Sequence, residues 1–381
     1  MAENRGRVRT RARSVRRIAS AIGGRLEAVG QWLLGRLLDL VLPVTPNIPL
    51  DDVTDVRRVL LVRPNFRLGN ALITSPLIAA LRERFPHAQI DYLGGEGTLA
   101  VVEHLGIDER IAISRRFVAR PWRFVALFAR LRRRKYDVAI EAAMGSFSGG
   151  LYTFLSGARF RVGITGRGDR FLNVRLPAAP VTHAYDGPVA FAERLGVTCE
   201  PRPVYVVTEA EAADALATLK LLRLADHERV HPFVALFVGG HGAKRWPEDC
   251  WVALARRVAG EGASVVVFTG PDEAGAVERL RERLAGVARV LEPRPLRAFA
   301  ALLATATVVV TPDSGPMHLA AALGVPCVAV LSNRASTFFP PRGPLDVSLV
   351  EPSVADVERA LLAHPSWPAL VGGSGRATRV A

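Results

Sequence analysis

A turn that could hold a phosphate group lies between three valines at 308–310 and a helix expected over 317–323. Asp313 or Ser314 can cap this helix. The first amides of a helix lack intrahelical partners and, with the helix dipole, favour an anion. His318 lies in the first turn, where it could donate to a phosphate or diphosphate oxygen. An ordinary capped helix of an α/β domain fits the same pattern equally well.

A second turn combines glycines with cations. Residues 239–247 read GGHGAKRWP, and a proline can open the helix that follows. This is not a P-loop, because Arg245 stands where a Ser or Thr would hold magnesium, and the dinucleotide pattern G-x-G-x-x-G is also absent. Lys244 on such a turn nevertheless suits a phosphate. We predict that Gly239, Gly240 and Lys244, together with the turn at 313, grip a diphosphate without a metal.

A third turn, Gly-Pro-Asp-Glu at 270–273, follows the next apolar run. A carboxylate at this place could accept a hydrogen bond from a ribose hydroxyl or an adenine amine. The alternative is that Asp272 or Glu273 only caps a helix.

A fourth candidate, the loop 63–72, follows the first apolar run of the chain and reads RPNFRLGNAL. Gly69, just before a helix, could let a substrate approach the backbone closely. Arg63 and Arg67 either face that substrate or are simply solvated.

All four turns follow apolar runs that alternate with helical patterns, which is typical of parallel sheets with crossover helices. Ligands bind beyond the carboxyl ends of such strands, so we expect an α/β fold with two units that meet near the Pro-Arg-Pro segment 201–203. The first unit should have strands at 59–62, 90–93, 138–140 and 161–164 and helices at 72–85 and 189–195. A strand at 204–207 should mark the boundary, and the second unit should have strands at 233–238, 264–269, 308–310 and 328–331 with helices near 251, 278, 302 and 319.

Composition places the chain among globular proteins. Its 381 residues, 49% of them hydrophobic, are enough for two domains with their own cores. The three cysteines (Cys199, Cys250 and Cys327) are too scattered for a zinc site or a disulfide framework. A reducing cytosol fits this usage best, and residues 368–381 are expected to form a disordered tail.

The first fifty residues differ in character from the rest. Nine arginines stand against three carboxylates in the first forty, and apolar residues recur at helical spacing from Leu26 to Leu40. The run is too short and too charged to span a membrane, and no signal-peptide cleavage site follows it. We predict a basic amphipathic helix on an anionic cytoplasmic leaflet. The alternative is a helix packed on the protein's own surface behind a disordered tail.

A second basic segment lies between Ile111 and Tyr136, where nine cations occur without any acidic residue. An anionic, lipid-linked glycan that is phosphorylated at its core would suit this density. The alternative is a solvated helix face that only improves solubility.

Taken together, these segments resemble the ADP-heptose:lipopolysaccharide heptosyltransferase family, glycosyltransferase family nine, from about residue 59 to about residue 331. The resemblance is carried by 63–76 with 81–86, by Gly239-Gly240 with Lys244 and Trp246-Pro247, by 270–273, and most specifically by Asp313-Ser314-Gly315 with His318 and Gly324-Val325-Pro326. It implies a GT-B architecture, with two Rossmann-like domains facing across a cleft. The acceptor domain would span 51–205 and the nucleotide-sugar domain 206–367.

The resemblance also implies roles for individual residues. The donor diphosphate would be contacted by Lys244, Ser314, Gly315 and His318 beside the Gly239-Gly240 turn. Glu273 would contact the nucleoside, Asp313 would orient its turn, and Met317 would pack near the donor. The acceptor would be held by Arg63, Arg67, Gly69 and Asn70.

The implied chemistry is inverting transfer of a sugar from a nucleotide sugar, with ADP-heptose the expected donor, no metal and no cofactor. Lys244 and His318 would stabilise the departing diphosphate. The acceptor hydroxyl must also lose a proton to a base, and family members that transfer heptose carry an Asp where this chain has Asn70. A carboxamide cannot be a general base, so Asn70 would position the acceptor while Glu96 or Glu141 takes the proton.

The leading interpretation is therefore a cytoplasmic glycosyltransferase, peripheral to the inner membrane, that acts on a lipopolysaccharide or another lipid-linked glycan. A nucleic-acid-binding protein is the alternative from another class, because the sequence is strongly basic with a net charge of +14. No recognised nucleic-acid-binding module accompanies the basic segments to support it. A family member with another donor, or one that has lost transfer, is a third possibility on account of Asn70.

Overall fold

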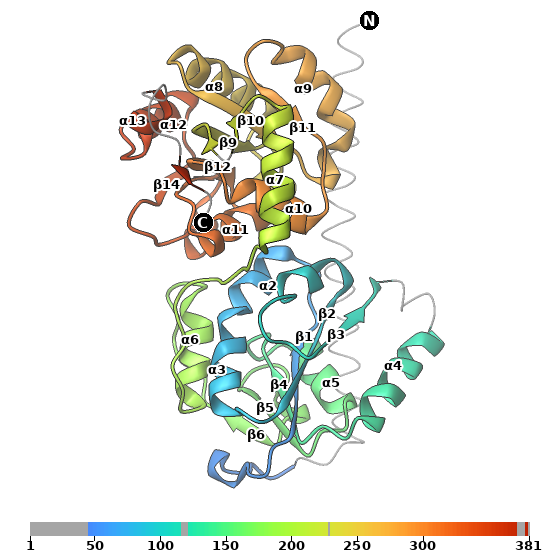
Figure 1. The fold of residues 1–381 in the computed structure, drawn as a ribbon. Helices are drawn as coiled ribbons and strands as arrows, with labels where there is room; N and C mark the ends of the chain where they lie inside the picture. Colours follow the sequence, from blue (N-terminus) through green and yellow to red (C-terminus); the bar gives the residue numbers. More distant parts are fainter. Residues whose placement is uncertain (1–44, 116–120, 228, 372–377, 380–381) are drawn as a thin grey trace, which may run out of the picture.

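The computed structural model describes residues 45–115, 121–227, 229–371 and, for the backbone, 378–379. The chain forms two lobes, each built on a six-stranded parallel sheet flanked by helices (Figure 1). The N-terminal sheet has the order β3-β2-β1-β4-β5-β6. Its strands are β1 (Arg58–Arg63), β2 (Gln89–Gly95), β3 (Glu109–Ile113), β4 (Val138–Glu141), β5 (Phe160–Ile164) and β6 (Val174–Leu176).

The C-terminal sheet repeats this order as β11-β10-β9-β12-β13-β14, again with parallel pairing throughout. In both sheets the chain starts in a central strand and reverses direction next to it, which is the doubly wound arrangement of Rossmann-like domains. The predicted α/β class is confirmed. The strands are β9 (Phe233–Phe237), β10 (Ser264–Phe268), β11 (Arg289–Leu291), β12 (Val308–Pro312), β13 (Cys327–Leu331) and β14 (Val347–Val350).

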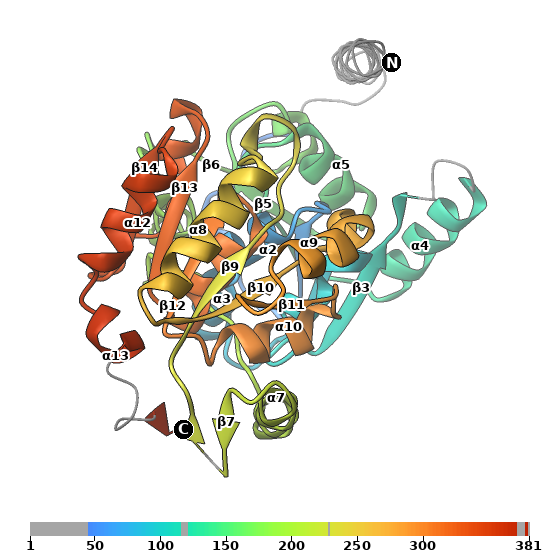
Figure 2. The same cartoon turned by 90° about the horizontal axis from the view of Figure 1, so that it is seen from above.

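Helices connect the strands within each lobe (Figures 1 and 2). Those of the N-terminal lobe are α2 (Leu68–Thr74), α3 (Pro76–Arg84), α4 (Pro121–Arg133), α5 (Phe147–Leu155) and α6 (Asp186–Arg194). Those that follow are α7 (Glu209–Leu221), α8 (Glu248–Gly260), α9 (Val277–Arg283), α10 (Leu296–Leu303), α11 (Gly315–Leu323), α12 (Val354–Leu362) and α13 (Trp367–Val371).

The strands that the sequence predicts inside the two units are its most apolar segments. Leu60, Leu61 and Val62 in β1 are fully buried, as are the first four residues of β9. Strands covered on both faces by helices read as continuous apolar runs, so every apolar run predicted as a strand inside the two units is one. In the two six-stranded sheets, the strands that were not predicted are the four edge strands, β3, β6, β11 and β14. Charged or polar residues interrupt the apolar run in each of them.

Two predicted elements are wrong. The single helix expected over 72–85 is two helices, α2 and α3, that meet at Ser75, because Pro76 lacks the amide needed to continue the first helix. The strand expected at 204–207 is absent, since 198–208 has no regular structure. The Val204 amide instead donates to Ser75 Oγ at 2.8 Å. The boundary expected between residues 205 and 206 falls in this irregular connection between α6 and α7.

The chain ends are partly described. Residues 45–50 lie along the β5–β6 edge, where the Ile48 amide donates to Asn173 O at 2.7 Å. The amphipathic helix expected in the first fifty residues falls on 1–44, outside the described residues. A tail disordered from residue 368 is wrong for 368–371, which belong to α13 because Leu370 is buried in the C-terminal core. Residues 378–379 pair with β8 (Arg229–Val230), which also pairs with β7 (Ala225–Asp226). No helix within the described ranges is long and apolar enough to cross a membrane.

Candidate active site

The order of each sheet reverses at one point, between β1 and β4 in the N-terminal lobe and between β9 and β12 in the C-terminal lobe. Loops that leave the carboxyl ends of strands at such a point are the usual ligand sites of these folds. The predicted turn with Lys244 follows β9, and the predicted turn with Asp313 follows β12. The topology therefore brings the two turns together although they are 69 residues apart.

Lys244 and Asp313 form an ion pair in which Nζ and Oδ2 are 2.5 Å apart. The Asp313 side chain is 4% exposed and that of Lys244 is 38% exposed, so the lysine keeps one side open to solvent. Lys244 Nζ also lies 5.1 Å from the centroid of the Phe339 ring, in a cation–π contact. The buried Asp313 carboxylate thus holds the Lys244 ammonium group at the carboxyl ends of the central strands β9 and β12.

The start of α11 has no side-chain cap. Ser314 stands at the N-cap position, but its hydroxyl lies 3.2 Å from Pro312 O and 3.3 Å from Thr311 Oγ1 instead of capping the helix. Asp313, the other residue expected to cap, is paired with Lys244. The capping prediction is wrong for both residues, because their side chains turn back toward β12 and Lys244. What remains at the helix start is an uncapped N-terminus, whose dipole and first amides favour an anion.

Arg245, which the sequence analysis used only to exclude a P-loop, holds the Gly239-Gly240 turn. Its Nε donates to Gly240 O at 2.6 Å, and its Nη2 lies 2.5 Å from Glu273 Oε1. A Cβ on Gly239 would lie 2.3 Å from a ring carbon of Phe237, so only glycine fits there. The predicted donor residues 239, 240 and 273 are therefore one connected unit. The signal for Arg245 was a second cation directly after Lys244.

Glu273 is mostly buried in this unit. Burial raises the pKa of its carboxyl group, and the neighbouring Arg245 guanidinium acts in the opposite direction. Oε2 faces the glycines of both turns, since a Cβ on Gly270 would lie 2.9 Å from it. The carboxylate thus sits between the turn after β9 and the turn after β10.

His318 lies between the two lobes. Its Nδ1 is 3.0 Å from Tyr185 Oη, which comes from the residue just before α6 in the N-terminal lobe. A Cβ on Gly69 would lie 2.5 Å from His318 Cδ2, so the backbone of α2 covers the ring. Burial lowers the pKa of His318 to about 4, with Asp313 opposing and Lys244 adding to this shift.

Lys244 and His318 nonetheless border the same place. Both contact Phe339, since the His318 and Phe339 ring centroids are 6.4 Å apart. Met317, beside His318, is fully buried. Tyr185 and the nearby His183 were missed by sequence reasoning; their only signal was a His-Ala-Tyr sequence shortly before a predicted helix.

The predicted acceptor residues run from the last residue of β1, Arg63, to the first turn of α2. Arg67 is exposed, and Asn70 is half-buried within the first turn of α2. Arg63 has its Nε buried without a hydrogen-bond partner among the described residues. Burial lowers the pKa of Arg63, and the nearby Tyr92 and Glu141 oppose this. Gly69 meets His318 instead of open space, so the expected free approach to its backbone is not seen.

The two carboxylates considered as bases differ sharply. Glu141 at the end of β4 is fully buried and accepts hydrogen bonds from the amides of Ala143 and Gly145, both at 2.7 Å. Burial raises its pKa, and the hydrogen bonds from Gly145 and Ala143 lower it. Its carboxylate therefore shapes the loop that leads into α5. Glu96, at the start of the 3₁₀ helix Glu96–Val101, is exposed.

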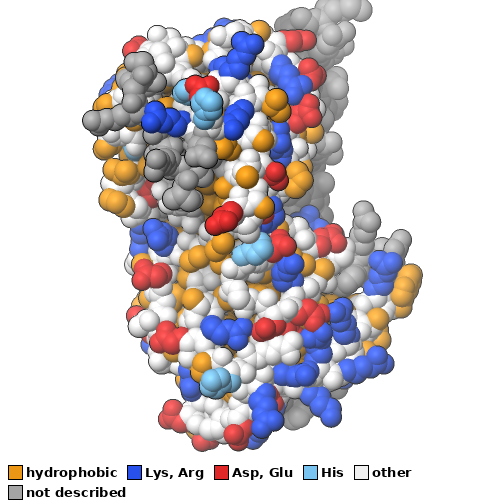
Figure 3. All heavy atoms as spheres, in the orientation of Figure 1, with side chains coloured by type: hydrophobic (Ala, Val, Ile, Leu, Met, Phe, Trp, Pro, Cys, Tyr) orange, Lys and Arg blue, Asp and Glu red, His pale blue; other side chains and the backbone are white. Residues whose placement is uncertain are grey.

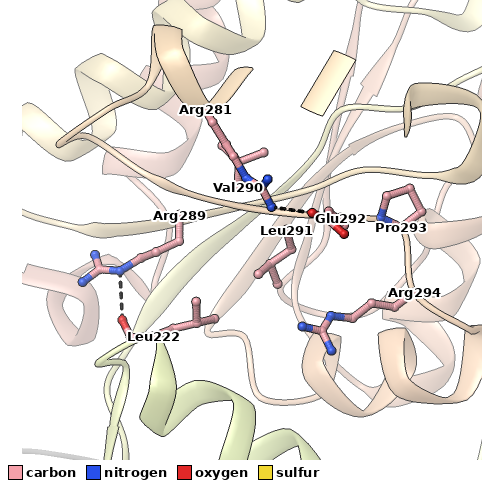
Figure 4. Close-up of a pocket in the computed structure, with 8 residues that line it drawn as sticks. All are labelled: Leu222, Arg281, Arg289, Val290, Leu291, Glu292, Pro293 and Arg294. Atoms are coloured by element: carbon pink, nitrogen blue, oxygen red, sulfur yellow. Dashed lines mark hydrogen bonds and ion pairs between the residues drawn. The ribbon is translucent and has the colours of Figure 1, made fainter. Parts of the chain in front are cut away.

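A separate cavity of about 690 Å³ lies along the outer edge strand β11 (Figure 4). Arg281 reaches Glu292 across it, with Nη2 and Oε1 2.9 Å apart, and Arg289 Nε donates to Leu222 O at 3.0 Å. β11 is two strands away from β9 and three from β12. None of the predicted site residues lines this cavity. Across the described residues, no three His, Cys, Asp or Glu side chains are grouped so that they could hold a metal ion.

Comparisons with a family model, with similar sequences and with solved structures all find heptosyltransferases. Residues 124–359 match the family described as Glycosyltransferase family 9 (heptosyltransferase). The chain is 27% identical over 288 residues to lipopolysaccharide heptosyltransferase 1 of Escherichia coli K12, which covers 72% of this chain and 87% of that protein.

Two solved structures from Escherichia coli share the fold. ADP-heptose lps heptosyltransferase II has a TM-score of 0.63 at 24% identity, over 83% of this chain and 98% of that chain. A heptosyltransferase solved with ADP-2-deoxy-2-fluoro heptose has a TM-score of 0.62 at 23% identity, over 80% and 97%. The predicted GT-B architecture is confirmed.

Proposed function

Since the chain belongs to glycosyltransferase family 9 and is thus a glycosyltransferase, we propose that it transfers heptose from ADP-heptose to a lipopolysaccharide or another lipid-linked glycan. Two similar proteins are named for lipopolysaccharide heptosyl transfer, and a further similar structure is of a heptosyltransferase with ADP-2-deoxy-2-fluoro heptose. We further propose that transfer inverts the anomeric centre, needs no metal, and takes place at the cytoplasmic face of the inner membrane, where a lipid-linked acceptor is accessible.

One observation carries this proposal: Lys244 and Asp313 meet at the switch point of the C-terminal sheet, beside the uncapped start of α11. A diphosphate leaving the sugar develops negative charge, which Lys244 and the first amides of α11 would stabilise. Asp313 would hold the ammonium group in place. Because the carboxylate is buried and the ammonium is partly exposed, the lysine can exchange solvent for a phosphate oxygen at little structural cost.

The remaining donor contacts follow from the same geometry. Ser314 and Gly315 would bind the diphosphate through the turn, and the Glu273 carboxylate would accept from the nucleoside. His318 would reach the diphosphate after α2 withdraws from its ring, since Gly69 now covers it. Its low pKa keeps the imidazole neutral near pH 7, so it would act as a hydrogen-bond donor without a positive charge.

The acceptor would be held from the N-terminal lobe. Arg63 and Arg67 would pair with phosphate or carboxylate groups of an anionic glycan, and Asn70 would orient the attacking hydroxyl. For the base we favour Glu96 over Glu141, because Glu96 is exposed while two backbone amides already occupy the buried Glu141 carboxylate.

Thermal stabilisation by nucleotides tests the donor site. A ligand that binds only the folded state at 100 times its Kd adds about 2.7 kcal/mol to the free energy of unfolding. ADP and ADP-heptose should raise Tm more than UDP or UDP-sugars. Lys244→Met should abolish this rise, whereas Arg281→Met in the separate β11 cavity should leave it intact.

Transfer itself is measured with ADP-heptose and a deacylated, water-soluble lipopolysaccharide core. The wild type should form product, with or without EDTA, and Lys244→Met should not. The donor assignment would be refuted if UDP-sugars raised Tm more than ADP-sugars. It would also be refuted if ADP raised the Tm of Lys244→Met and of Arg281→Met equally. Loss of transfer in EDTA that added metal restores would refute metal independence.

A further inference from the structure

Helix α4 stands out from the side of the N-terminal lobe, next to the edge strand β3 (Figures 1 and 2). Its inner side packs against the lobe through Leu127, Phe128 and Leu131, which are buried in an apolar cluster with β1, β3 and β4. Phe124 and Phe128 pack edge to face, with ring centroids 4.6 Å apart. The helix is therefore firmly attached on one side, and its other side is presented to solvent.

The solvent side of α4 is unexpectedly apolar. Trp122 is 64% exposed and Val125 is 66% exposed. Ala126 and Ala129 continue the same side along the helix and are also exposed. We call these four residues the α4 outer face. Trp122 and Val125, one turn apart on a protruding helix, have no role in the core, because the core contacts of α4 are made by its inner side.

Cations surround the α4 outer face. Arg123, Arg132, Arg133 and Lys135 are exposed and have no ion pair with any described residue, while Arg130 is paired with Glu109. No acidic residue occurs between positions 110 and 136. Figure 3 shows apolar and basic side chains side by side on this protruding part of the N-terminal lobe. A patch with an apolar centre and an excess of positive charge around it is complementary to a surface with apolar depth and negative charge.

We propose that the α4 outer face docks on an anionic lipid bilayer, with Trp122 and Val125 inserted at the headgroup level and the surrounding cations on lipid phosphates. Indole side chains favour the membrane–water interface, and arginines near an anionic leaflet add attraction that salt screens. A bilayer accounts for both halves of the pattern. A nucleic acid would use the cations, but Val125 and the two alanines would gain nothing from its backbone.

This inference rests on the proposed function for its biological reason, since a lipid-linked acceptor is presented at a membrane. The docking itself involves none of the residues placed in the donor or acceptor sites. α4 belongs to the N-terminal lobe, which also carries the predicted acceptor residue Asn70.

Vesicle binding of the full chain tests the proposal. The vesicles contain phosphatidylcholine with or without about 30 mol% phosphatidylglycerol, and bound protein is measured by co-sedimentation. Trp122→Ser/Val125→Ser should weaken binding to the anionic vesicles about tenfold. Arg123→Gln/Arg133→Gln should weaken it about as much and reduce its salt dependence. The matched control is Leu221→Ser on α7, where an 87% exposed leucine lies outside the patch and its removal should change nothing.

A local readout separates α4 from any other part of the chain that binds lipid. Trp122 is one of five tryptophans, so its emission is the difference between the wild type and Trp122→Phe. That difference should shift to the blue and be quenched by brominated lipid on anionic vesicles. The proposal is overturned if the chain binds vesicles without this Trp122 signal, if the control weakens binding as much as the α4 variants, or if the patch variants lose binding to an RNA oligonucleotide and not to vesicles. ADP should still stabilise every variant, so failure of docking and failure of the proposed function are distinguishable.

Discussion

At the scale of single residues, the candidate site depends on carboxylates whose surroundings give them different tasks. Asp313 is buried and paired with Lys244, so its carboxylate holds a cation. Glu141 is buried and bound by backbone amides, so it holds a loop. Glu96 is exposed and unengaged by comparison, and a base must be accessible to the hydroxyl that it deprotonates.

The identity of the base is a prediction at this scale. Glu96→Gln should lower kcat for transfer by at least about 100-fold, as removal of a general base does, without loss of stability. Asn70→Asp supplies a carboxylate at the first turn of α2, so the double variant Asn70→Asp/Glu96→Gln should recover part of the lost rate. Unchanged kcat in Glu96→Gln would rule out this residue as the base.

Glu141 is expected to behave differently. Glu141→Gln replaces one of the two carboxylate oxygens with an NH2 donor, so one of the two backbone N–H groups loses its acceptor and faces another donor. This should cost about 2 kcal/mol in the free energy of unfolding. Urea denaturation measures this cost, and Glu96→Gln is the matched control, with a change within about 0.5 kcal/mol. A stable Glu141→Gln enzyme with a specific loss of kcat would point to Glu141 as the base instead.

The buried imidazole of His318 predicts a pH dependence of stability. Its pKa is about 4 in the folded chain against 6.5 in the unfolded chain, so between these values the unfolded state binds a proton that the folded state does not. The contribution of His318 is complete above pH 6.5 and falls by roughly 3 kcal/mol as the pH drops to 4. Urea denaturation across this range should therefore show a steeper decline for the wild type than for His318→Gln. Parallel curves would show that His318 is not held neutral.

At the scale of elements, two glycines set the contact between the lobes. α2 packs against α11 at a distance that Gly69 and Gly315 permit, because a Cβ on Gly69 would strike His318 and one on Gly315 would lie 2.8 Å from Leu68. The helix that carries the predicted acceptor residues thus touches the helix that carries the predicted donor residues. Gly69, which was predicted to let a substrate approach the backbone, is in this structure the point where α2 contacts the C-terminal lobe.

Gly69→Ala tests this contact. The added methyl group should push α2 off His318 and lower the free energy of unfolding by about 1–3 kcal/mol, as overpacking does. Gly97→Ala is the control, since a Cβ there meets nothing within 4 Å. Thermal and urea denaturation of both variants measure the difference. Equal, small effects would mean that the α2–α11 contact is loose in solution.

At the scale of the whole molecule, contacts between described residues join the lobes on two sides, in addition to the contact of α2 with α11. On one side, the Ala184 amide donates to Phe338 O at 2.9 Å, and Arg342 pairs with Asp186 at 2.8 Å. On the other side, Arg297 of α10 forms a bidentate pair with Glu211 of α7 inside the C-terminal lobe. Its Nε also lies 3.9 Å from Glu103 Oε2 of the N-terminal lobe. It also donates to Ala100 O of the N-terminal lobe at 3.3 Å. The connecting segment is thereby fixed to both lobes.

Arg297 should matter far more than Arg342 for the joint stability of the lobes. The Arg297 side chain is 15% exposed, and Arg297→Met would leave Glu211 without its cationic partner, which should cost about 2–3 kcal/mol. The same change removes the hydrogen bond to Ala100 O of the N-terminal lobe, so it should also separate the unfolding of the two lobes. Arg342→Met removes an exposed ion pair and should cost less than about 1 kcal/mol. Calorimetry distinguishes one transition from two, and equal effects of the variants would contradict this assignment.

Local sequence was sufficient for the fold class, most of the strands and the positions of the four turns. Buried parallel strands must be apolar along their whole length, and the turns after them need glycines and polar residues, so both leave a signal within a few neighbouring residues. The same reasoning missed the short edge strands, because charged or polar residues interrupt their apolar runs. It also merged α2 with α3, because a single proline separates two segments that share one helical pattern.

Tertiary structure alone decided what the site residues touch. Asp313 was read as a cap and is the partner of Lys244; His318 was read as a phosphate ligand and now bonds Tyr185, which is 133 residues away. Gly69 faces a histidine of the other lobe, and Arg245 ties two turns together. Such contacts depend on the order of strands in the sheets and on how closely the lobes pack. Neither is encoded in the spacing of neighbouring residues, because chain segments far apart in sequence become neighbours only once the sheets are complete.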